Sequence, residues 1–162
     1  MEFLTSFVSS GTATPFIHLA VAAFLGMVLG LERVYARKIA GIRTYGLVSV
    51  GSALFVVVST LVVDQFIGLT NYDPLRVAAQ IVVGIGFLGA GTIFRDHAHV
   101  EGLTTAAGLW VAAGVGMAAG FGLYGIATFA TAITLFIFSA MWTLERKVKR
   151  ALGKWDENET ES

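Results

Sequence analysis

The chain has 162 residues, of which 56% are hydrophobic and only 14% charged, and its eleven basic residues balance its eleven acidic ones. An average soluble domain carries about 25% charged residues, so a soluble fold of this size would leave too much apolar surface in water, and lipid is the expected solvent. There is no cysteine, which excludes disulfides, iron–sulfur clusters and thiol catalysis.

Charge-poor stretches follow one another along the chain. The first ten residues hold no basic residue, unlike a signal peptide, so the first apolar segment is expected to stay in the mature protein. Residues 15–31, 44–63 and 77–94 each come close to the ~20 apolar residues that cross a bilayer. Residues 102–144 carry no charge and would form one helix of about 64 Å, twice the ~30 Å of a bilayer core.

This last stretch is therefore expected to fold into two spans, 103–119 and 122–144, joined by a turn at Gly120-Phe121-Gly122. The sequence thus predicts an all-α membrane protein, with a bundle of five transmembrane helices within residues 1–144. The first loop, the third loop and the tail hold ten basic residues, against one in the remaining loops. Since Lys and Arg accumulate on the cytoplasmic side, the amino terminus is expected outside and the carboxyl terminus in the cytoplasm.

The tail, residues 145–162, is basic and then acidic. Apolar residues at helical spacing between residues 144 and 155 predict either an amphipathic helix in the headgroup plane or an extension of the last span. Residues 156–162 are acidic and polar, and are expected to be disordered.

Small residues recur every four positions in the first and fourth spans, including Gly26, Gly30, Gly108 and Gly116. This spacing places them on one helix face, where two backbones can approach closely. It indicates a tightly packed bundle within the chain, with a homodimer as the alternative.

The third span contains the run GIGFLGAG, with glycines at positions Gly84, Gly86, Gly89 and Gly91. It matches the pattern G-x-G-x-x-G, but a dinucleotide site requires a strand before it and a helix after it, and this run lies inside an apolar span. The run is better explained as a closely packed or irregular helix, and it is a candidate cavity lining.

Polar side chains gather at the ends of the spans. Burying an ionisable group at membrane depth costs free energy, so such a group is a functional candidate. A long basic side chain avoids this cost when its charge reaches the headgroups, as is expected for Arg33, Arg37 and Lys38. We expect Glu32 to pair with Arg43. The other polar candidates are Thr44, Thr104 and Thr105 on the inner side, and Arg76 and Gln80, one helical turn apart, on the outer side.

Two loops contain side chains that could bind metals. Asp64, Asn71 and Asp73 in the outer loop offer the oxygen ligands that Mg²⁺ prefers. Solvent-exposed loops that bind no metal have the same composition. His97 and His99 stand beside Asp96, where a metal site is the less expected reading. No serine, histidine and acid are arranged as a hydrolytic triad, so neither enzymatic activity nor a cofactor is expected.

Three sequence blocks together resemble the MgtC/SapB family. The first contains GLER from residue 30, KIAGIRT from residue 38 and LVSVGSA from residue 47; the second contains RVAAQ from residue 76 and GIGFLGAG from residue 84. The third contains VEGLTTAA from residue 100, followed by Leu109 and Trp110. Longer members carry a soluble carboxyl-terminal domain after the spans, so the resemblance is to the shorter SapB-like members or to the membrane domain alone.

This resemblance implies a multi-pass protein of the bacterial inner membrane, in a family associated with growth at low magnesium and, in some pathogens, with virulence. It draws attention to Glu32, Arg43, Thr44, Arg76, Gln80, Thr104, Thr105 and Trp110.

Two functions are compatible with these features. The leading hypothesis is a regulatory or scaffold protein in magnesium homeostasis, which acts through helix contacts with itself or with a membrane partner; no nucleic acid is expected. The alternative is a Mg²⁺ transporter or channel with a polar path lined by Glu32, Arg43, Arg76 and Gln80. No acid lies in the middle of a span, and basic residues beside a path would repel a divalent cation.

Overall fold

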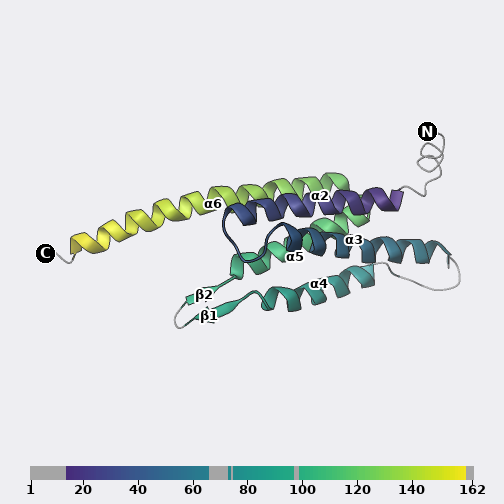
Figure 1. The fold of residues 1–162 in the computed structure, drawn as a ribbon, viewed down its shortest axis with the longest axis horizontal. Coiled ribbons are helices and arrows are strands. Elements are labelled where there is room, and N and C mark those ends of the chain that lie inside the picture. The colour runs from purple at the N-terminus through teal and green to yellow at the C-terminus, as the bar shows by residue number, and fades with distance from the viewer. Residues whose placement is uncertain (1–13, 66–72, 74, 97–98, 160–162) are drawn as a thin grey trace.

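A computed structural model describes residues 14–65, 73, 75–96 and 99–159 (Figure 1). This part of the chain forms five helices and one small hairpin. The helices are α2 (Thr14–Tyr35), α3 (Ile42–Gln65), α4 (Leu75–Ala90), α5 (Leu103–Gly120) and α6 (Tyr124–Glu159), and the strands are β1 (Phe94–Asp96) and β2 (His99–Glu101). The prediction of an all-α protein with five helices is confirmed.

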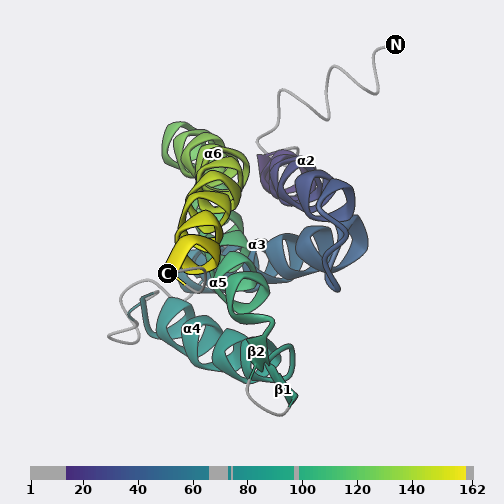
Figure 2. The same ribbon diagram turned by 90° about the vertical axis from the view of Figure 1, so that its left-hand side faces the viewer.

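The helices lie side by side with α5 at the centre (Figure 2). Helix α5 contacts each of the other four, whereas α4 lies at the periphery and packs on α5 far more than on α3. The α2–α3 turn and the β1–β2 hairpin lie at the same end of the bundle (Figure 1), which we call the hairpin end. Helices α2 and α4 both begin at the opposite end.

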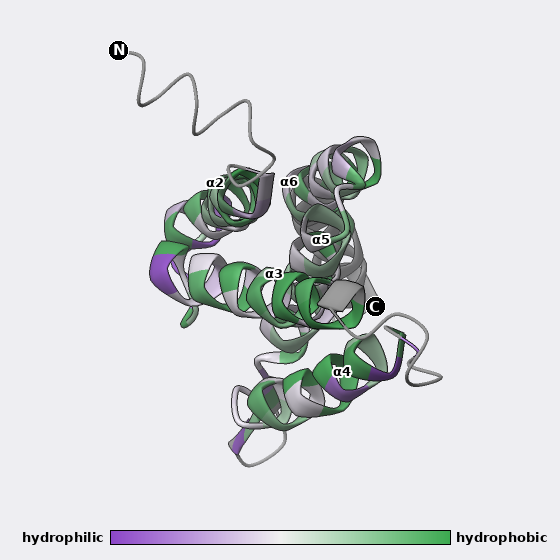
Figure 3. Cartoon of the chain, turned by 90° about the vertical axis from the view of Figure 1, so that its right-hand side faces the viewer, coloured by the Kyte–Doolittle hydropathy of each residue, from purple (hydrophilic) through white to green (hydrophobic). Residues whose placement is uncertain are grey.

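Hydrophobic residues make up most of the described helices (Figure 3), and many of them lie on the outer surface of the bundle. Large side chains that point outwards include Phe24 on α2, Phe55 on α3, Phe87 on α4 and Phe129 on α6, each more than 60% exposed. In water such a surface would be an aggregation site, whereas in lipid it is solvated. Three helices are long and apolar enough to cross a membrane, namely residues 14–35, 42–63 and 103–120, while residues 75–90 and 124–140 form shorter apolar helices. The chain is therefore a membrane protein.

Helix α3 is held between α2 and α5 by glycines. A Cβ at Gly26 of α2 would lie 2.6 Å from the Ser49 Cβ, and one at Gly116 of α5 would lie 2.7 Å from the Ser49 carbonyl carbon. The Ser49 hydroxyl donates a hydrogen bond to the Ala22 carbonyl oxygen across 2.8 Å. Gly30 approaches the backbone of Ile42 equally closely. Three backbones thus meet around Ser49, which is fully buried.

The predicted turn between the last two helices is confirmed. Helix α5 ends at Gly120, and Gly122 adopts a left-handed φ of 74°. The amides of Gly122 and Leu123 donate to the carbonyls of Ala119 and Ala118, which is the pattern that closes a helix through a left-handed glycine.

Two segments differ from the sequence expectation. The third span was expected to reach residue 94, but α4 ends at Ala90. The amide and the hydroxyl of Thr92 both donate hydrogen bonds to the Gly89 carbonyl oxygen, before the hairpin begins. The short hairpin has too few residues to give an alternating pattern in the sequence. The tail continues α6 as one helix to Glu159. Residues 156–159 are therefore helical rather than disordered. Of the two alternatives for the tail, the structure shows the extension of the last span.

Candidate functional site

The predicted polar residues lie at two separate ends of the bundle. Arg76 and Gln80 are exposed on the first turns of α4, whereas Glu32 and Arg43 flank the α2–α3 turn at the hairpin end (Figure 1). The four residues predicted to line one polar path therefore do not converge on one pocket.

Glu32 pairs with Arg33 and not with Arg43, which corrects the expected ion pair. The Arg33 Nε and Nη2 atoms both contact the Glu32 carboxylate. Arg43 is exposed in the first turn of α3. Its charge can be solvated there, so it would gain little from the ion pair. Arg33 is only 2% exposed, and a buried cation needs a counter-charge beside it.

Arg33 is also the functional candidate that sequence reasoning dismissed as reaching the headgroups. Its guanidinium carbon lies 3.4 Å from the centroid of the Phe138 ring on α6, a cation–π contact that offsets part of its desolvation. A signal for this burial was present, because Arg33 follows Gly26 and Gly30 at positions i+7 and i+3 and so shares their helix face.

Tyr45 and Gly108 complete this buried cluster at the hairpin end. Tyr45 is fully buried, and its hydroxyl donates across 3.4 Å to the carbonyl oxygen of Thr105. A Cβ at Gly108 would lie 2.8 Å from the Phe138 ring and 3.1 Å from the Tyr45 ring. Glycine at this position therefore lets both aromatic rings lie against α5.

The remaining candidates at this end vary in exposure. Thr105 is buried, whereas Thr44 and Thr104 are exposed, and Trp110 on α5 is 55% exposed. None of them lies in a polar channel. Thr104 lines two surface hollows, one of which it shares with Thr105.

Part of the glycine run of α4, including Gly84, lines an open groove. A cavity of about 500 Å³ lies between α3 and α4 and is lined from α4 by Gly84, Ile85 and Leu88, among others; we call it the α3–α4 groove. Its α3 wall includes Gly51 and Ser52, and Gln80 adds one amide. The run is regular α-helix as far as Ala90, so the prediction of a cavity lining describes it better than the prediction of irregular backbone.

The eight glycines singled out in the sequence fall into two groups. Those on α2 and α5 are in close contact with neighbouring helices, as described above. On α4, Gly89 makes an ordinary contact of 3.6 Å with the Ala106 Cβ and Gly91 meets only carbonyls of its own helix end. A Cβ at Gly84 or Gly86 would meet no atom within 4 Å.

The metal hypotheses gain no support from the part of the chain that the structure describes. The Asp73 carboxylate accepts the amide hydrogen of Leu75 across 2.9 Å, as the cap of α4, while Asn71 and His97, like the side chains of Asp64 and His99, lie outside the described residues. No group of three or more His, Asp or Glu residues is found among the described ones.

Comparison with known proteins gives matches over most of the chain. Residues 19–147 match the model of the MgtC family. Protein MgtC of Brucella abortus is 53% identical over 89 residues, or 55% of this chain and 35% of that protein. Protein MgtC of Salmonella typhimurium is 46% identical over 92 residues, or 56% of this chain and 36% of that protein.

A third relative is matched over a longer segment. The putative magnesium transporter YhiD of Escherichia coli K12 is 40% identical over 135 residues, or 82% of this chain and 63% of that protein. The chain thus spans about a third of the two MgtC proteins and under two thirds of YhiD. No solved structure matches.

Proposed function

The chain belongs to the MgtC family, and we propose that it is a multi-pass inner-membrane protein that serves magnesium homeostasis as a regulatory or scaffold protein. The magnesium link is supported by a relative of the chain that is named a putative magnesium transporter. Five crossings are supported by the two shorter apolar helices, since the 16 residues of α4 extend about 24 Å. The ten-to-one distribution of basic residues supports a cytoplasmic hairpin end.

One observation carries the proposal of a helix-binding role. Both glycines of α2, and Gly108, Gly116 and Gly120 of α5, are in contact with other helices of the chain. A Cβ at Gly51 or Gly84, on the two walls of the α3–α4 groove, would meet no atom within 4 Å. In a membrane, small residues let another backbone approach closely, and a single amide such as that of Gln80 can hydrogen-bond to it. The groove has the composition of a helix interface that lacks its second helix.

We propose that the occupant is a transmembrane helix of a different membrane protein. A symmetric dimer with the groove on its two-fold axis would place two grooves face to face and leave both unfilled. A convex partner helix with small or branched side chains would fill a groove of this kind. No described constellation suggests catalysis, which leaves binding as the function that the geometry supports best.

Photo-crosslinking in cells tests this proposal. A photo-reactive amino acid would replace Ile81 or Leu88 in the groove, with Phe129 on the outer face of α6 as the matched apolar control. We expect protein adducts from the two groove positions and none from the control. Adducts with a second copy alone would overturn the heterologous partner, and the absence of any protein adduct would overturn the helix-binding role.

A groove-filling variant connects the contact to physiology. Gly84→Leu should abolish the adducts and reproduce the growth defect of a deletion strain in magnesium-poor, acidic medium. Gly125→Leu places the same side chain on an exposed position of α6 with no atom within 4 Å, and should do neither. Normal growth of the deletion strain itself would remove the magnesium link.

A Mg²⁺ transporter is the alternative that the name of YhiD suggests. Against it, Glu32 is neutralised by Arg33, and Arg43 and Arg76 beside a path would repel a divalent cation. Uptake of Mg²⁺ into liposomes that contain the purified full chain, above the background of empty liposomes, would favour this alternative over the regulatory role.

A further inference from the structure

Two adjoining hollows open at the hairpin end, and their linings differ in character. The first, of about 400 Å³, is lined by Arg37, Lys38, Glu101 and Thr105 together with backbone near residue 102, and we call it the polar hollow. The second, of about 550 Å³, runs between α5 and α6, and we call it the apolar hollow. Its walls are formed chiefly by Leu103, Ala107, Val111, Ile137 and Phe138.

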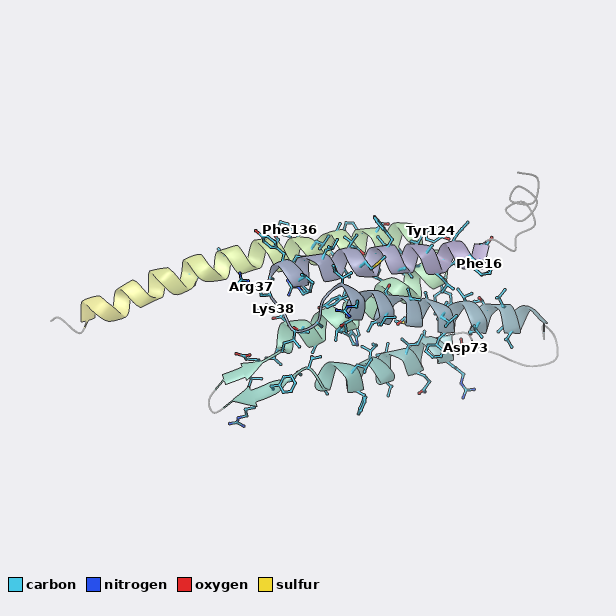
Figure 4. All side chains as sticks on the ribbon, viewed as in Figure 1. Phe16, Arg37, Lys38, Asp73, Tyr124 and Phe136 are labelled. Carbon is cyan, nitrogen blue, oxygen red and sulfur yellow. The ribbon has the colours of Figure 1, made fainter. Side chains whose placement is uncertain are left out.

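The two hollows share Lys38, Leu103 and Thr104 in their linings, so they lie next to each other. Their junction lies just beyond the end of α2 and at the first turn of α5. Figure 4 shows Arg37 and Lys38 together at the α2–α3 turn. Helix ends that carry cations mark the headgroup level of a membrane, so the polar hollow lies at headgroup depth and the apolar hollow leads into the acyl-chain region.

The charges that face the polar hollow leave an excess of one positive charge. Arg37 and Lys38 contribute two cations and Glu101 one carboxylate. Arg33, which borders the apolar hollow, is already neutralised by Glu32. The Thr104 hydroxyl and the first amides of α5, which has no side-chain cap, can add hydrogen bonds to an anion that the cations hold.

Arg37 occupies a backbone position that normally favours glycine. Its φ is 54°, and it is the only non-glycine residue in the described part of the chain with a positive φ. The amides of Arg37 and Lys38 close α2 on the carbonyls of Val34 and Arg33, which is the motif that Gly122 completes at the end of α5. A glycine would adopt this backbone conformation without strain, so Arg37 lies here at a conformational cost.

We propose that the two hollows together form a binding site for an anionic phospholipid. The phosphate lies between Lys38 and Arg37 in the polar hollow, and one acyl chain follows the apolar hollow along Ala107 and Val111. The site is independent of the α3–α4 groove, and it holds whether or not a partner helix binds there.

Native mass spectrometry of the purified full chain in detergent tests the site. The probes are phosphatidylglycerol, zwitterionic phosphatidylcholine and inorganic phosphate. We expect phosphatidylglycerol to be retained, phosphatidylcholine to bind at least fivefold more weakly, and inorganic phosphate in excess not to displace the bound lipid. Displacement by inorganic phosphate, or equal retention of both lipids, would overturn the assignment.

Four variants locate the site. Lys38→Gln and Arg37→Gly should each weaken phosphatidylglycerol binding about fivefold, the contribution of one cation near a membrane surface. Ala107→Phe should block the apolar hollow and lower binding without changing the charge. Arg76→Gln removes an equally exposed cation from the opposite end and should alter binding less than twofold.

Arg37→Gly separates binding from folding. It should keep or raise the thermal stability while it weakens binding, because glycine relieves the left-handed backbone. Retention of phosphatidylglycerol that is the same in Lys38→Gln, Arg37→Gly and Arg76→Gln would overturn the proposal.

Discussion

Replacing Gly116 by alanine should weaken the fold, because the new Cβ would meet the backbone of α3. It would lie 2.7 Å from the carbonyl carbon and 2.8 Å from the Cα of Ser49, and closer still to the carbonyl oxygen. Ordinary van der Waals contact begins at 3.4 Å, so α3 and α5 would have to separate by about 0.7 Å or more. Helix α3 has little room to move away, since Gly26 of α2 packs against Ser49 from the other side.

The expected loss in the free energy of unfolding follows from two opposing terms. Overpacking of a closely packed interface costs about 1–3 kcal/mol, and a clash with backbone belongs at the upper end of that range. Alanine favours a helix over glycine by up to about 1 kcal/mol, which offsets part of the cost. The net destabilisation of Gly116→Ala should be about 2 kcal/mol.

Gly114→Ala is the matched control on the same helix. A Cβ at Gly114 would meet no atom within 4 Å, so this variant gains the helix propensity without the clash and should be as stable as the original chain or slightly more so. Unfolding of the purified chain in detergent, followed by circular dichroism, measures the difference. Equal stability of the two variants would refute the close packing of α5 on Ser49.

Two further predictions concern polar side chains of α2. Glu32→Gln leaves the buried Arg33 without its counter-charge and should lower the free energy of unfolding by about 3 kcal/mol. Arg43→Gln, at an exposed position, should lower it by less than about 0.5 kcal/mol. Equal losses of the two variants in the same unfolding assay would mean that Arg43 is the true partner of Glu32. The His18 Nδ1–H group donates across 2.7 Å to the Gly120 carbonyl at the end of α5. His18→Ala should therefore lower the unfolding free energy by about 1 kcal/mol, and an unchanged midpoint would show that this hydrogen bond does not contribute.

The helices were predictable because their signal is long and redundant. Apolar length and the absence of charge indicated each helix without reference to the others, and the paired glycines marked the turn before Tyr124. The hairpin was missed because three-residue strands are too short for a pattern. The Glu32–Arg43 pair was wrong because an adjacent and more deeply buried arginine competed for the carboxylate, and burial depends on packing that the sequence shows only indirectly.

The candidate site was harder to predict for the same reason. Gln80 and the GIGFLGAG run could be selected from the sequence. The sequence does not show that Gly84 faces an open groove while Gly116 is covered, because this depends on the distance between α4 and α3. Tyr45 and Phe138 are ordinary apolar-span residues in the sequence, and only the helix arrangement brings them together around Gly108.

Helix α6 does not end where its apolar part ends. About nineteen residues lie between Ala140 and Glu159 in the same unbroken helix, a rod of about 28 Å at 1.5 Å per residue. Such a rod behaves as a lever: a tilt of about 10° at Ala140 displaces its far end by about 5 Å, the height of one helical turn. Any occupant that shifts the packing of α6 on α5 therefore produces its largest movement at Glu159, the far end of this rod.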